Sequence, residues 1–177
     1  KMFKKIKINK NKGIVFWIEG FSGSGKTTIA KKSHKGISNI FGTTMVLSGD
    51  ILRKLLNLKG YSKSDRTKNS YKTRKFIKLL TDQKINVIYT VVGLNYKAKS
   101  IYKKYLNNFV DIFISADIKK ILKMKKKKKV YGLKKNIVGI DIKAEFPKNP
   151  NVVIRNNFDK PTEQLSAELV DKLKKII

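Results

Sequence analysis

Short, continuously apolar runs alternate along the chain with longer segments whose apolar residues recur at helical spacing. The apolar runs predict strands at 13–20, 43–49, 85–92, 110–116 and 151–156. The periodic segments predict helices at 26–40, 51–58, 65–84, 96–109, 117–126 and 161–177. Strands that are apolar throughout are typical of parallel sheets, because helices cover both of their faces. The pattern therefore predicts an α/β fold with a five-stranded parallel sheet and helices on both faces.

The chain of 177 residues shows neither an internal repeat nor a clear linker, so we expect a single domain over 1–177. The irregular region at about 125–149 carries glycines, prolines and charges, and we expect it to form a short, mobile lid. No apolar run reaches the roughly 18 residues of a membrane span. The absence of cysteine excludes disulfides and thiolate metal sites. We expect a cytoplasmic protein with no membrane partner, for which a homodimer is a compatible assembly.

The net charge of +30 has two interpretations. One is binding to nucleic acid, and the other is compositional drift toward lysine. Drift is favoured, because the lysines spread along the whole chain and no aromatic residues alternate with them. Nucleic acid is therefore not the expected partner. The drift makes arginine informative, since a retained arginine is a candidate for a task that needs a planar, bidentate group. The 42 basic residues include arginine only at positions 53, 66, 74 and 155.

A glycine-rich loop lies between the first predicted strand and helix. Its sequence, GFSGSGKTT, matches G-x-x-x-x-G-K-[ST] in the required context. Such a loop turns backbone N–H groups toward phosphate oxygens at a helix N-terminus. We expect Lys26 to act in catalysis on the β- and γ-phosphates and Thr27 to bind Mg²⁺. Arg155 ends the last strand, where P-loop kinases often shape the adenine site. The expected ATP-binding loop residues are Gly20, Ser22, Gly23, Ser24, Gly25, Lys26, Thr27 and Thr28.

Asp50 follows the second predicted strand, where open parallel sheets present ligand-binding residues. A carboxylate there could orient a hydroxyl, accept its proton or hold Mg²⁺. The alternative is that Asp50 only caps the helix at 51–58. Arg53 follows one helical turn later, and Arg66 and Asn69 share one helix face. These residues indicate an acceptor with anionic groups.

Five segments together resemble the adenylylsulfate kinase family over about residues 15–154: FWIEGFSGSGKTTIAKK, SGDILRKLL, KGYSKSDRTKNS, INVIYTVV and VGIDIKAEFPKNPNVVI. The resemblance implies a P-loop kinase that uses Mg²⁺ and transfers the γ-phosphate of ATP to the ribose 3′-hydroxyl of adenylyl sulfate. It implies that Asp50 is the catalytic carboxylate. It also implies that Arg53, Arg66 and Asn69 contact the phosphosulfate end of the acceptor. Tyr61 stands where the family usually has a Phe that stacks on the acceptor.

Several positions depart from the family pattern. Ser48 replaces the first Asp of Asp-Gly-Asp, and Asn69-Ser70-Tyr71-Lys72 replaces Asn-Ile-Arg-Arg. Ile137 stands where a Phe usually stacks on the acceptor base, and Lys128–Tyr131 only roughly match the lid motif. Some similar proteins phosphorylate cytidine diphosphoramidate in capsule pathways, and the altered base contacts favour this acceptor.

Three other functions remain open at this stage. Adenylyl sulfate could be the acceptor, which would make the chain an enzyme of sulfate activation. The chain could instead be a basic, nucleic-acid-binding P-loop protein. It could also be an inactive relative that acts as an interaction protein, although intact Lys26, Thr27 and Asp50 oppose that interpretation.

Overall fold

The fold is seen in a computed structural model that describes residues 5–124 and 136–177. Five strands form one parallel sheet in the order β2-β3-β1-β4-β5. The strands are β1 (Ile14–Glu19), β2 (Thr44–Ser48), β3 (Asn86–Val91), β4 (Asn108–Ser115) and β5 (Val152–Arg155). The helices are α1 (Lys26–Phe41), α2 (Gly49–Leu55), α3 (Lys63–Asp82), α4 (Tyr96–Tyr105), α5 (Ile118–Lys123) and α7 (Thr162–Ile176). The five-stranded parallel sheet predicted from the sequence is confirmed.

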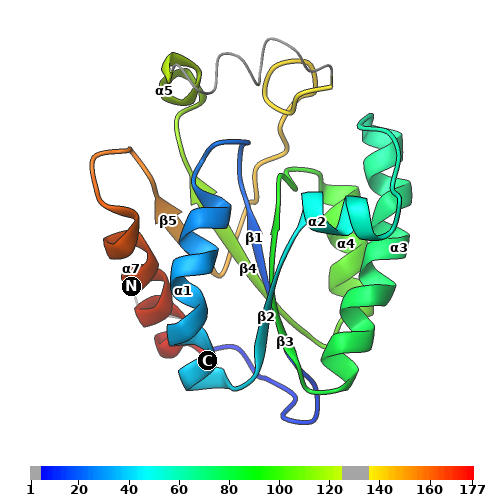
Figure 1. The fold of residues 1–177 in the computed structure, drawn as a ribbon, viewed down its shortest axis with the longest axis vertical. Coiled ribbons are helices and arrows are strands. Elements are labelled where there is room, and N and C mark those ends of the chain that lie inside the picture. The colour runs from blue at the N-terminus through cyan, green and yellow to red at the C-terminus, as the bar shows by residue number, and fades with distance from the viewer. Residues whose placement is uncertain (1–4, 125–135) are drawn as a thin grey trace.

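Helices cover both faces of the sheet, with α1 and α7 on one face and α3 and α4 on the other (Figure 1). The central strand β1 shows why both faces must be covered. Phe16 and Ile18 belong to the core beneath α1 and α7, whereas Val15 and Trp17 belong to the core beneath α3 and α4. Because successive side chains of a strand point to opposite faces, an all-apolar strand needs a packed layer on each side.

Several element boundaries differ from the predicted ones. Helix α4 ends at Tyr105, and β4 already begins at Asn108, which the periodicity had placed in the helix. The buried Asn108 side chain exchanges hydrogen bonds with the backbone of Asn9 and also donates to the Lys12 carbonyl, at 2.8–2.9 Å. These contacts are made across 96–99 residues of sequence, so helical spacing could not reveal them.

Helix α3 begins at Lys63, two residues before the predicted start. Ser62 is its N-cap, and Asp65 completes a reciprocal capping box by accepting the Ser62 backbone N–H. Asp65 therefore lies inside the first turn, because the Ser-x-x-Asp pattern starts the helix earlier than its first apolar residue does.

The predicted lid at 125–149 is described only from residue 136. Its first part, 125–135, includes the Lys128–Tyr131 segment and lies outside the described residues. Within 136–149, Glu145 accepts the Tyr96 backbone N–H at 2.6 Å and pairs with Lys63 at 2.5 Å. These contacts tie the described part of the segment to the start of α4 and to α3. Its mobility stays a prediction.

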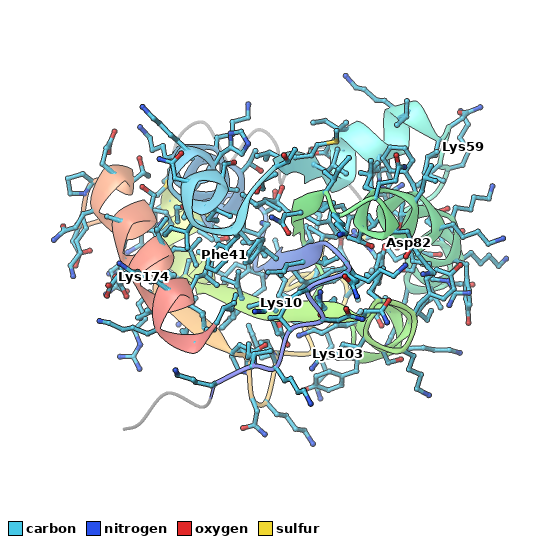
Figure 2. All side chains as sticks on the ribbon, turned by 90° about the horizontal axis from the view of Figure 1, so that it is seen from below. Lys10, Phe41, Lys59, Asp82, Lys103 and Lys174 are labelled. Atoms are coloured by element: carbon cyan, nitrogen blue, oxygen red, sulfur yellow. The ribbon has the colours of Figure 1, made fainter. Side chains whose placement is uncertain are left out.

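Lysine side chains project from the molecule on several sides. Figure 2 labels Lys10, Lys59, Lys103 and Lys174 around the layered core, on different faces. This distribution agrees with compositional drift toward lysine rather than with one binding patch. Within 5–124 and 136–177, no helix has the length and apolarity needed to cross a bilayer.

Candidate active site

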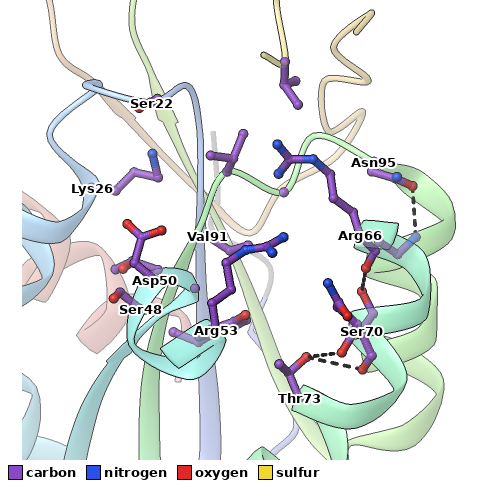
Figure 3. Close-up of a pocket in the computed structure, with 18 of the residues that line it drawn as sticks. Ser22, Lys26, Ser48, Asp50, Arg53, Arg66, Ser70, Thr73, Val91 and Asn95 are labelled. Atoms are coloured by element: carbon purple, nitrogen blue, oxygen red, sulfur yellow. Dashed lines mark hydrogen bonds between the residues drawn. The ribbon is translucent and has the colours of Figure 1, made fainter. Parts of the chain in front are cut away.

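A cavity of about 600 Å³ opens at the carboxyl ends of β1, β2 and β3. Its volume is typical of a small-molecule site, and its place at the strand ends is where open α/β sheets bind ligands. The glycine-rich loop, α2, α3 and residues 136–138 each contribute to its walls (Figure 3). It brings together these predicted residues: Ser22, Gly23, Lys26, Thr27, Asp50, Arg53, Tyr61, Arg66, Asn69 and Ile137.

Two glycines fix the shape of the loop between β1 and α1. Gly20 has φ +153°, and a Cβ there would lie 2.5 Å from the Ile114 carbonyl oxygen. Gly25 is the N-cap of α1 with φ +91°, a left-handed conformation that favours glycine. The loop therefore needs glycine at both positions that the motif requires.

Lys26 begins α1 with its side chain buried against the loop. Its Nζ donates to the Phe21 carbonyl at 2.6 Å, and the residue also lines the cavity. An ammonium held in this way lies where a triphosphate cradled by the loop would need positive charge. Gly20, Ser24, Gly25 and Thr28 belong to the same loop and helix start, although they do not line the cavity.

Asn156 supports the glycine-rich loop through a hydrogen bond, and the sequence analysis did not identify this residue. The buried Asn156 donates from Nδ2 to the Ser24 carbonyl at 3.0 Å, and its own N–H donates to Ser115 at 2.8 Å. The only sequence signal was a polar residue directly after a strand. Its neighbour Arg155 is exposed and lies outside the cavity, so a role for Arg155 at adenine stays a prediction.

The structure shows that Asp50 is not the cap of α2. Ser48 is the N-cap, since its Oγ accepts the Ile51 N–H at 3.2 Å. Asp50 lies exposed in the first turn, on the same cavity wall as Lys26 (Figure 3). The alternative that Asp50 serves only as a helix cap is therefore wrong, and its carboxylate can serve chemistry.

Thr27 and Asp50 offer oxygen donors that fit Mg²⁺. Both line the cavity, and the Thr27 hydroxyl lies 3.4 Å from the Thr90 hydroxyl at the end of β3. No group of three or more His, Asp or Glu side chains forms a metal site in the described part of the chain. Mg²⁺ usually arrives with substrate phosphates and takes only one or two protein ligands, so this sparse oxygen set suits it.

Two guanidinium groups form the cationic part of the cavity. Arg66 donates from Nε to the Tyr61 carbonyl at 2.9 Å and from Nη2 to the Asn136 carbonyl at 3.3 Å. Arg53 donates from Nη1 to the Gly60 carbonyl at 2.8 Å. Burial lowers the pKa of Arg66, and the nearby charge of Arg53 adds to this effect. Two close, partly desolvated cations favour an anionic ligand.

Tyr61 is the aromatic residue that lines the cavity next to the two arginines, whereas Trp17, Tyr89 and Tyr102 line its far end. The guanidinium groups of Arg53 and Arg66 lie 4.1 and 5.8 Å from the ring centre of Tyr61, so they restrict the stacking of a base on this ring. Ile137 lines the cavity with an aliphatic side chain. Phe146 does not line the cavity, because it packs edge-on against Phe21 and Phe113 with ring centres 5.5 and 5.9 Å apart. Among the described residues next to the two arginines, Tyr61 is therefore the aromatic side chain on which a base could stack.

The far end of the cavity is rich in hydroxyl groups, and sequence reasoning missed it. Thr73 of α3 is hydrogen-bonded to the hydroxyl of Tyr102 on α4. Burial raises the pKa of Tyr102, and it raises that of Tyr89 further, so both phenols stay protonated. The indole Nε1 of Trp17 has no hydrogen-bond partner among the described residues. The additional lining residues here are Trp17, Ser70, Thr73, Tyr89, Asn95, Ala98 and Tyr102.

A buried ionic network supports the loop after β3. Lys99 of α4 pairs with Glu19 and lies 2.9 Å from a carboxylate oxygen of Asp111. Glu19 also accepts the Leu94 backbone N–H at 3.0 Å. Burial raises the pKa of Glu19, and the charge of Lys99 opposes that shift. The network holds residues 92–95 in place, several of which line the cavity.

Comparison with known proteins agrees with this geometry. A family model described as Adenylylsulphate kinase matches residues 12–155. A Campylobacter jejuni protein named cytidine diphosphoramidate kinase is 30% identical over 168 residues, covering 90% of this chain and 98% of the relative. A Clostridium kluyveri adenylyl-sulfate kinase is 31% identical over 168 residues, covering 91% of this chain and 83% of the relative.

A solved structure shares the fold. The Mycobacterium tuberculosis APS kinase CysC, in complex with AMPPNP and APS, superposes with a TM-score of 0.80 at 24% identity. The match covers 92% of this chain and 98% of that one.

Proposed function

The chain belongs to the adenylylsulphate kinase family, and from this premise we propose that it phosphorylates the ribose 3′-hydroxyl of an activated nucleotide, preferring cytidine diphosphoramidate. Members of this family are kinases that transfer phosphate to a hydroxyl group, with ATP as the donor. Two acceptors must be distinguished, since relatives of nearly equal identity are named for different ones.

One observation carries the proposal: a single cavity joins the phosphate-binding loop to a pair of arginines. Lys26 and Asp50 lie at one side, Arg66 of α3 lies at the other, and the Arg53 side chain extends from α2 between them (Figure 3). A nucleotide whose ribose lies at Asp50 can place its anionic chain against the two guanidinium groups. This arrangement orients the ribose hydroxyl toward the phosphate donor.

The reaction follows from these positions. The ribose oxygen forms a bond to the γ-phosphorus as the bond to the β-phosphate oxygen breaks, and ADP leaves. Asp50 orients the hydroxyl and accepts its proton. Lys26 stabilises the charge that develops on the transferred phosphoryl oxygens. Mg²⁺, held through Thr27 and Asp50, would supply further charge neutralisation on the phosphates.

The preference for cytidine rests on the altered base contacts. Stacking of a base on an aromatic side chain is worth roughly 1–3 kcal/mol. With Arg53 over one face of Tyr61 and Ile137 in place of an aromatic residue, adenine loses one stacking partner. Since 1.4 kcal/mol is tenfold, the loss weakens adenine binding by about 5- to 150-fold. The arginine contacts do not depend on the base, so a smaller base keeps them.

The test compares two acceptors at fixed ATP and Mg²⁺. Cytidine diphosphoramidate should give the higher kcat/KM, and mass spectrometry should find one added phosphate on the nucleotide. Ile137→Phe should raise kcat/KM for adenylyl sulfate by about 5-fold or more, because it restores a stacking partner. A clear advantage for adenylyl sulfate in the unmodified protein would instead assign the chain to sulfate activation.

A further inference from the structure

The cavity continues past the arginines into a neutral end. Among the described lining residues, formal charges belong only to Lys26, Asp50, Arg53 and Arg66. Beyond Arg66, the wall is formed by α3, α4, β1 and β3, and its polar atoms are mostly hydroxyl groups. Ser70 and Thr73 are its α3 members, 6% and 3% exposed. A ligand group that reaches this end must therefore be recognised by hydrogen bonds rather than by charge.

The hydroxyl hydrogens of Ser70 and Thr73 can each form a hydrogen bond to a backbone carbonyl of α3. Ser70 Oγ donates to the Arg66 carbonyl at 2.8 Å, and Thr73 Oγ1 donates to the Asn69 carbonyl at 3.1 Å (Figure 3). A hydroxyl has one hydrogen and two lone pairs. Either hydroxyl can donate in the bond between Thr73 and Tyr102, and when Thr73 donates to the backbone the Tyr102 hydroxyl is the donor. Ser70 and Thr73 therefore present hydrogen-bond acceptors to the cavity.

The covalent order of the acceptor nucleotide indicates which group reaches them. In the proposed function the ribose lies at Asp50 and the anionic chain at Arg53 and Arg66, so a terminal group would lie next along α3. Ser70 is four residues from Arg66, about 6 Å along the helix axis, and Thr73 lies nearly one further turn on. In the proposed function the base lies toward Tyr61 and Ile137, which line another part of the cavity wall.

We propose that Ser70 and Thr73 form a subsite that accepts N–H hydrogen bonds from the terminal group of the acceptor, and so selects an amide-bearing diphosphate over a phosphosulfate. The inference rests on the proposed function. A terminal amido group supplies N–H donors that match these lone pairs. A sulfonate carries only acceptor oxygens, so each hydroxyl would have to turn away from its α3 carbonyl to bind it. The terminal group thus adds selectivity that is independent of the base.

The experiment separates the effect of the base on kcat/KM from the effect of the terminal group. Four acceptors combine cytidine or adenosine with either a diphosphoramidate or a phosphosulfate end, and kcat/KM is measured for each. The variants are Ser70→Ala and Thr73→Val, with Thr73→Ser as the conservative rescue. Thr67→Val is the matched control, because Thr67 donates to the Lys63 carbonyl at 3.0 Å in the same way but lies outside the cavity.

The decisive quantity is the ratio of kcat/KM for amidate over sulfate at one base. This ratio cancels any loss of folded protein. A lost hydrogen bond should lower it about 3- to 10-fold in Ser70→Ala and Thr73→Val. Thr73→Ser and Thr67→Val should retain the unmodified ratio, and the cytidine-to-adenosine ratio should not change in any variant.

Two outcomes overturn the inference. In the first, the unmodified protein phosphorylates these nucleotides, but kcat/KM in the variants changes equally for acceptors with an amidate end and with a sulfate end. The subsite then does not select the terminal group, and the proposed function stands. If the unmodified protein phosphorylates none of the four acceptors, the proposed function fails and the inference fails with it.

Discussion

Replacing Arg66 by lysine keeps the positive charge but removes the planar guanidinium. Arg66 donates to the carbonyls of Tyr61 and Asn136, and these contacts use two of the five N–H groups of a guanidinium. The others remain for an anionic ligand in the cavity. A lysine ammonium has three donors at one point and cannot join both carbonyls and a ligand in this geometry.

The expected fall in kcat/KM for the acceptor follows from the hydrogen bond that the substitution removes. A hydrogen bond to a charged group is worth about 1.5–3 kcal/mol. If Arg66→Lys loses one such bond to the acceptor, kcat/KM for the acceptor should fall about 10- to 150-fold. The KM for ATP should change little, because Arg66 lies across the cavity from the phosphate-binding loop (Figure 3).

Steady-state kinetics with each substrate varied in turn measures both constants. Arg74→Lys is the control, because Arg74 lies on the same helix but stacks on Tyr71 and Tyr105, at 4.7 and 4.1 Å from their ring centres. It should leave the acceptor KM unchanged. Equal increases in KM for ATP and for the acceptor would refute the placement of Arg66 at the acceptor.

Three other substitutions test separate parts of the structure. Lys26→Ala should lower kcat by about 10²-fold or more, since it removes a charge-assisted contact made in the transition state, and near-native turnover would exclude the assigned role. Asp50→Asn should reduce turnover far more than ATP affinity measured by calorimetry, whereas no change in either would show that its carboxylate has no part in the reaction. Lys99→Met leaves two buried carboxylates without their cation and should cost about 3–5 kcal/mol in urea unfolding. Lys103→Met, at a half-exposed lysine 4.0 Å from Asp111, should change stability by less than about 1 kcal/mol, and equal losses in both variants would contradict the buried network.

The parts of the site that depend on local sequence could be predicted. The loop residues and Asp50 follow from short spacings next to apolar strands, and the structure places Lys26, Thr27 and Asp50 on one cavity. The predicted sheet also follows from local patterns, because each strand contains a run of apolar residues. The strand order and the strand boundaries required the structure.

The remaining residues depend on tertiary contacts that no local pattern records. Thr73 meets Tyr102 only because α3 packs on α4, 29 residues later in the chain. Lys99 is one lysine among many in the sequence, and only its burial against Glu19 distinguishes it. Asn156 likewise reaches the phosphate-binding loop across 132 residues. These side chains gain their roles from packing, so composition and periodicity could not identify them.

The most direct test of the central claim is the position of the transferred phosphate. ATP labelled in its γ-phosphate is incubated with Mg²⁺, the protein and either cytidine diphosphoramidate or its 3′-deoxy analogue. The label should appear on the parent nucleotide and be absent from the 3′-deoxy analogue, since in the proposed function Asp50 and the arginines orient the 3′-hydroxyl toward the phosphate donor. Equal labelling of both nucleotides, or release of labelled phosphate without any labelled nucleotide, would contradict phosphorylation of the ribose 3′-hydroxyl.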